Sequence, residues 1–143
     1  MKKALCLLLI LAALPGLCGC RKETKLSTVN YTDYFDTQVL CDISNQGPEG
    51  DYRVGDGIIL VSLTKKSTTQ VEVDYISVEV TLDRPWSFDG SMKTTVPLEA
   101  VGDGTWYARL DCEAKWLLVN TSFRFSPADI QVKVRKIVGV AWE

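Results

Sequence analysis

The chain has 143 residues and a formal net charge of −2 at pH 7, from 16 Lys and Arg against 18 Asp and Glu. It contains no histidine, which excludes Ser-His-Asp and Cys-His catalysis and removes the commonest zinc and copper ligand. Its densest basic cluster, Lys133, Arg135 and Lys136, divides between the two faces of a strand, so nucleic-acid binding is not expected.

The N-terminus has the features of an export signal. Met1-Lys2-Lys3 is basic, and the uncharged apolar run from Ala4 to Ala13 is of the length typical of a secretory h-region and too short to span a bilayer. The block ends in Leu17-Cys18-Gly19-Cys20, which resembles the bacterial lipobox. The resemblance implies cleavage between Gly19 and Cys20 and acylation of Cys20.

Acylation would anchor the mature chain to a membrane, because several acyl chains on one residue bury far more CH₂ than a single chain does. The resemblance implies a location in the bacterial cell envelope, on the outer side of the cytoplasmic membrane or on the outer membrane. Arg21, directly after the lipidated residue, favours the outer membrane in a cell with two membranes. The alternative is an ordinary secretory signal with Cys20 left as a free thiol.

Three segments are expected along the chain: a signal peptide over residues 1–19, a flexible tether over 20–35, and one folded domain over 36–143. The tether follows from a polar composition without apolar periodicity. The domain is rich in β-branched and aromatic residues with Gly, Asp, Asn and Pro between the runs, which predicts strands. The expected strands are Thr37–Ile43, Gly57–Thr64, Val71–Leu82, Thr94–Val101, Thr105–Cys112, Trp116–Phe125 and Asp129–Trp142.

Two of these runs change phase. Val71 and Val73 alternate on one face and Ile76 to Leu82 on the other, which predicts a β-bulge near Asp74-Tyr75. In the last run the alternation of Ile130, Val132 and Val134 gives way to "IVGVAW", which is apolar at nearly every position. That end is expected to be buried on both faces or to form an exposed apolar strip.

About seven strands with frequent turn signals predict an all-β fold, an antiparallel β-sandwich. "VGDGTWYARL", in which Gly102-Asp103-Gly104 predicts a hairpin turn, resembles a turn entering a late strand in immunoglobulin-like domains of bacterial surface proteins. The resemblance implies an immunoglobulin-like arrangement.

Cys41 and Cys112 both fall on the apolar face of their strands. In an oxidising envelope they are a candidate disulfide that would close a long loop; the alternative is two separate buried thiols.

A contact surface is expected around Trp86 and Phe88, which lie in a turn, together with Asp51 and Tyr52 in the Gly-rich stretch from Ser44 to Gly57. Core packing of the two aromatic side chains is the alternative. Glu49, Asp51 and Asp56 in that stretch match no calcium-binding motif, and no metal, cofactor or catalytic residue is expected.

The sequence favours a lipid-anchored, non-catalytic binding or structural module whose partner is an envelope protein or polymer. Two alternatives stay open. One is a secreted inhibitor of a hydrolase such as lysozyme, and the other is a small hydrolase that uses only Asp and Glu.

Overall fold

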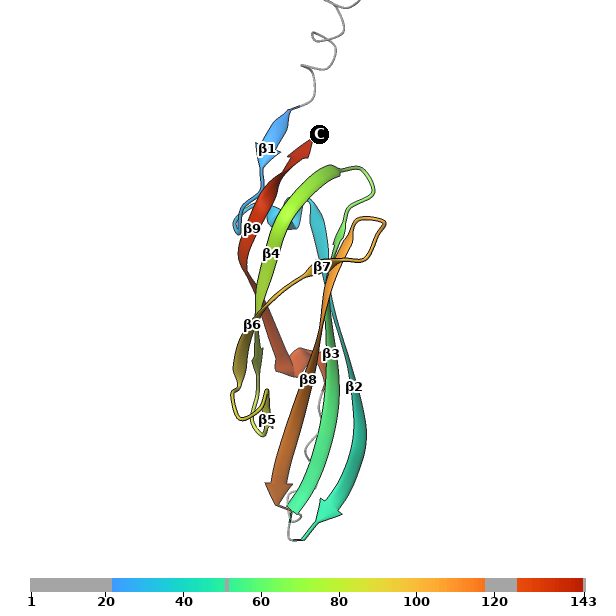
Figure 1. Ribbon diagram of the computed structural model, residues 1–143, viewed down its shortest axis with the longest axis vertical. Helices are drawn as coiled ribbons and strands as arrows, with labels where there is room; N and C mark the ends of the chain where they lie inside the picture. Colours follow the sequence, from blue (N-terminus) through green and yellow to red (C-terminus); the bar gives the residue numbers. More distant parts are fainter. Residues whose placement is uncertain (1–21, 51, 118–125, 143) are drawn as a thin grey trace, which may run out of the picture.

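Two antiparallel sheets packed face to face form the domain (Figure 1). The computed structural model describes residues 22–50, 52–117 and 126–142; for 44–49, 52, 53, 116 and 117 it describes the backbone only. The expected signal peptide and lipidation site, with Gly19 and Cys20, lie outside the described residues. The expected all-β antiparallel sandwich is confirmed.

Each sheet has long strands at its centre. Sheet A has the order β1-β9-β4-β6, formed by Glu23–Lys25, Ile130–Trp142, Gln70–Leu82 and Lys93–Pro97. Sheet B has the order β2-β3-β8-β5, formed by Phe35–Glu49, Tyr52–Lys65, Thr105–Leu117 and Trp86–Ser87, and β7 (Glu99–Ala100) also pairs with β8. Two short 3-10 helices, η1 (Tyr31–Asp33) and η2 (Pro127–Asp129), precede β2 and β9.

Several strand boundaries differ from the sequence-based expectation. β8 runs without a break to Leu117, where two strands were expected, and residues 118–125 lie outside the described part. The run expected from Thr94 to Val101 is divided at Leu98, because the chain passes there from sheet A (β6) to sheet B (β7). Leu98 is buried at the crossing, and its N–H donates to the carbonyl of Ile76.

The expected flexible tether is wrong for residues 23–35. Glu23–Lys25 forms β1 on the edge of sheet A, and the following Leu26 is only 2% exposed, with its N–H donating to the carbonyl of Gly139. Tyr34 and Phe35 are also buried. The segment is polar overall, but a few apolar side chains pack into the core. Backbone pairing of β1 with β9 orders the rest of the segment.

The core lies between the sheets, and its most deeply buried side chains come mainly from two strands. Ile59, Val61 and Leu63 of β3 are fully buried, as are the side chains of β4 that face them across the sandwich. Burying each such side chain contributes about 1.5–3 kcal/mol. The β4 members are Ile76, Val78, Val80 and Leu82.

Two bulges in the β4–β9 pair explain the changes of phase. The register shifts between Val73 and Tyr75, so the bulge expected near Asp74-Tyr75 is confirmed. It shifts again where Ser77 pairs with Lys136 and Val78 with Val134, which leaves Arg135 as the extra residue in β9. Each bulge moves the later side chains to the opposite face of the strand.

Candidate functional site

The structure removes Trp86 from the expected contact surface. Trp86 is 4% exposed and pairs through β5 with Ala114 of β8, and Phe88 packs half-buried against the core. A Cβ at Gly57 would lie 3.3 Å from Cζ3 of the Trp86 ring, so the ring covers the bare backbone of that glycine. These two aromatic side chains pack into the core, which was the alternative reading of the turn.

The Gly-rich stretch from Ser44 to Gly57 is a strand hairpin, although no strand was expected between Ile43 and Gly57. β2 continues to Glu49 and β3 begins at Tyr52, with a register shift between Ser44 and Gly47 and a left-handed residue, Gly50, in the turn. Asp51 and the side chain of Tyr52 lie outside the described part. The two long strands pair across this stretch, and the pairing outweighs its weak local strand propensity.

The candidate disulfide is absent: Cys41 and Cys112 are free thiols. Cys41 pairs with Ile59 and Cys112 with Gly57, so β3 runs between the two cysteine-bearing strands. Strands lie about 4.8 Å apart, which separates the two backbones by roughly 9.6 Å, beyond the ~7 Å that a disulfide tolerates.

Both thiols have raised pKa values. Burial, with a smaller effect of the nearby Cys41, raises the pKa of Cys112 to about 11. Burial also raises the pKa of Cys41, with Asp129 and Asp42 adding to the effect. Because the thiolate is the reactive form, both cysteines are poor nucleophiles at neutral pH.

An exposed apolar patch lies on the outer face of sheet B, the face turned away from sheet A. Leu40 of β2 pairs directly with Leu60 of β3, and they are 50% and 36% exposed. Ile58 follows on the same face of β3, and Tyr107 of β8 lies diagonally next to Leu60. We call these four residues the apolar patch.

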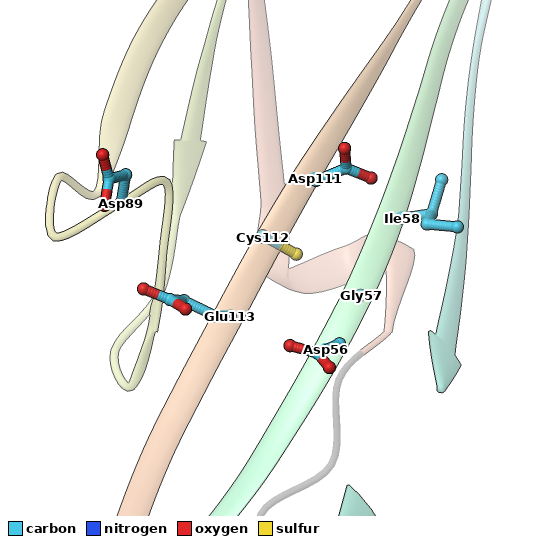
Figure 2. Close-up of a pocket in the computed structure, with 7 residues that line it drawn as sticks. All are labelled: Asp56, Gly57, Ile58, Asp89, Asp111, Cys112 and Glu113. Carbon is cyan, nitrogen blue, oxygen red and sulfur yellow. The ribbon is translucent and has the colours of Figure 1, made fainter. Parts of the chain in front are cut away.

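Carboxylates border the apolar patch. Figure 2 shows Asp56 on β3, Asp111 and Glu113 on β8, and Asp89 in the turn after β5, around an open hollow of about 400 Å³ that Ile58 also lines. A second hollow of about 410 Å³ shares Asp56 and Glu113 with the first.

Two of these carboxylates oppose each other directly. Asp56 pairs with Glu113 in the β3–β8 ladder, and like charges in that position destabilise a sheet. Arg109 lies 3.6 Å from Asp111, but among the described residues no ion pair neutralises Asp56 or Glu113. The arrangement attracts cationic groups.

The described residues contain no group of three or more Cys, Asp or Glu side chains placed to hold a metal ion. All four carboxylates around the hollow are exposed.

Sequence reasoning did not single out this face, although the signal was present. The alternation in β8 places Tyr107, Arg109 and Asp111 together, opposite the apolar side. The sequence did not reveal which strands lie beside β8, and their pairing is what creates the patch.

No protein-family model matches the chain, and no curated protein or solved structure matches it either. The immunoglobulin-like arrangement therefore stays a prediction from the sequence. Within the described residues, no helix is both long and apolar enough to cross a bilayer.

Proposed function

We propose that the protein is a lipid-anchored, non-catalytic binding module of the bacterial envelope, and that the outer face of sheet B binds a protein with a basic and apolar surface. The observation that carries the proposal is the pairing of exposed Leu40 and Leu60 beside the opposed carboxylates of Asp56 and Glu113. Exposed apolar side chains bordered by charge are typical of interaction sites.

Charge complementarity favours a basic partner. Acidic side chains outnumber basic ones among the described residues on and beside this face. An anionic wall polymer would be repelled, whereas Lys or Arg from a partner would relieve the repulsion between Asp56 and Glu113. The acidic residues are Asp36, Asp42, Asp56, Asp89, Glu99, Asp111 and Glu113, and the basic ones are Arg109 and Lys115.

The lipid anchor is proposed on the sequence of Leu17 to Cys20. The absence of histidine and the exposed carboxylates support a role without catalysis. Inhibition of a basic hydrolase is a special case of the same binding face, and it would use the same residues.

Site-specific photo-crosslinking in the envelope of the source cell tests the binding face. A benzophenone side chain at Leu60 is expected to form an adduct with one protein, and the same group at Met92, directly before β6 of sheet A, is the matched control. The two positions are 36% and 38% exposed, but Met92 lies outside sheet B.

The crosslink at Leu60 should weaken several-fold in the Asp56→Asn, Glu113→Gln double variant, because the charges that attract the partner are lost. Circular dichroism would establish that this variant is folded. Equal adducts from Leu60 and Met92, or an adduct at Leu60 that does not change in the double variant, would refute the proposed face.

A further inference from the structure

The first strand brings the start of the mature chain to one end of sheet A. Glu23 pairs with Trp142, and Lys25 pairs with Val140, so β1 lies along the C-terminal part of β9 (Figure 1). Cys20 precedes Glu23 by only three residues. A chain reaches at most about 3.6 Å per residue, so Cys20 can lie no more than about 11 Å from the start of β1.

The same end of sheet A exposes apolar side chains. After the second bulge, Val138, Val140 and Trp142 of β9 point to the outer face, and Tyr75 of β4 pairs with Val138. Val138 and Tyr75 are 37% and 44% exposed, and the other two are half-buried. We call these four residues the β9 strip. An exposed apolar strip was one of the two outcomes expected for "IVGVAW", and in that run Val138 is exposed while Val140 and Trp142 are half-buried.

The aromatic rings of the β9 strip and the lysines beside it suit a lipid headgroup layer. Trp and Tyr are enriched at the interface between membrane and water, where the ring is buried and the polar end stays hydrated. Lys136 Nζ lies 5.7 Å from the centre of the Tyr75 ring, and Lys25 pairs with Val140. Two exposed carboxylates also border the strip, because Glu23 pairs with Trp142 and Glu72 pairs with Val140. Lysines in these positions can extend their amino groups to lipid phosphates.

We propose that the β9 strip rests in the headgroup layer of the membrane that carries Cys20, so that the domain is oriented on the bilayer. The inference rests on the proposed lipid anchor. The occupant is a phospholipid bilayer, because the short connection holds the strip within reach of that surface. With sheet A on the membrane, the outer face of sheet B points away from it, toward other envelope proteins.

Fluorescence quenching by bromine-labelled lipids tests this contact. The acylated full-length mature protein would be reconstituted in vesicles of phosphatidylethanolamine and phosphatidylglycerol with brominated acyl chains. Wild type is expected to lose the emission of Trp142, and Trp142→Phe should remove most of the quenching. Val101→Ser, at an exposed position directly after β7 of sheet B, is the matched control and should quench as wild type does.

Inserting a spacer tests whether the β9 strip itself binds lipid or is only held close to the bilayer by the short connection. With a flexible Gly-Ser spacer of about ten residues between Lys22 and Glu23, the quenching of Trp142 should persist at half or more of its original extent. Adding Tyr75→Ser and Val138→Ser to the spacer should reduce it several-fold. These two side chains are exposed, so the fold is expected to survive, and circular dichroism would establish that.

Failure of the contact and failure of the anchor give different results. If the protein is acylated and enters the detergent phase but Trp142 is not quenched, or if the spacer alone abolishes quenching, the β9 strip does not bind lipid. If intact mass shows no acyl chains and the protein stays in the aqueous phase, the proposed anchor is wrong, and the inference falls with it.

Discussion

At the scale of single residues, Gly57 leaves the space in which two side chains pack over the middle of sheet B. It lies opposite Cys112, and a Cβ there would come within 2.8 Å of Cys112 Sγ and 3.3 Å of the Trp86 ring. A bare backbone lets the thiol and the indole pack over β3. From the sequence, Gly57 is only the first residue of an expected strand, because nothing local indicates that a tryptophan from a distant turn will cover it.

Gly57→Ala is expected to lower the free energy of unfolding by about 1–3 kcal/mol, because the added methyl group displaces packed side chains. In a Cys112→Ala background the same change should cost less, since the nearest obstructing atom is gone. Urea denaturation of the four proteins measures the coupling. Equal costs in both backgrounds would mean that the thiol does not limit the space above Gly57.

The raised pKa of Cys112 predicts a loss of stability at alkaline pH. The thiol of the unfolded chain titrates near 9.0 and that of the folded chain near 11, so the unfolded chain loses its proton first. Stability from this group is complete below about pH 9 and falls as the pH rises toward 11.

By about pH 10.5, wild type should lose up to about 2 kcal/mol more than Cys112→Ala does, since each unit of pKa shift corresponds to about 1.36 kcal/mol. Comparing denaturation curves of the two proteins cancels the titration of Lys and Tyr. Parallel losses in both proteins would show that the thiol is not buried in the folded state.

At the scale of elements, the two bulges of the β4–β9 pair decide which side chains of β9 face the core. The sequence predicted the bulge in β4, because the change of phase between Val73 and Ile76 is visible in the pattern itself. It did not locate the one at Arg135, where the following residues are apolar on both faces. Arg135 forms a salt bridge with Glu79 at 3.6 Å, and Glu79 forms a second salt bridge with Lys93.

Gly139 lies against the first bulge, where a Cβ would collide with the carbonyl oxygen of Glu72 and the Cα of Val73. Gly139→Ala is therefore expected to cost 3 kcal/mol or more, about the upper range for overpacking. The obstructing atoms belong to the backbone, so trimming a neighbouring side chain should not rescue the variant. A melting temperature within a few degrees of wild type would contradict the observed register.

At the scale of the whole molecule, the all-β class and most long strands were predictable from alternation, whereas the pairing of strands was not. The contact surface expected at Trp86 was misplaced, because an aromatic side chain in a turn gives no sign of whether it folds inward. The face defined by Leu40, Leu60 and Asp56 exists only once β2, β3 and β8 lie side by side. The ordering of residues 23–26 likewise depends on pairing with β9, far away in the sequence.

We propose different roles for the two outer faces: that of sheet A toward the membrane, and that of sheet B toward a protein partner. Both roles depend on the chain being held by lipid a few residues before β1. An ordinary secreted domain would need neither the short connection nor a fixed orientation.

Intact-mass analysis of the mature protein from the membranes of its source cell tests this claim most directly. We expect a chain that begins at Cys20 and carries the added mass of acyl chains, all of which is lost in Cys20→Ser. A mature chain with an unmodified N-terminus, or a Cys20→Ser protein that still enters the lipid phase, would contradict it.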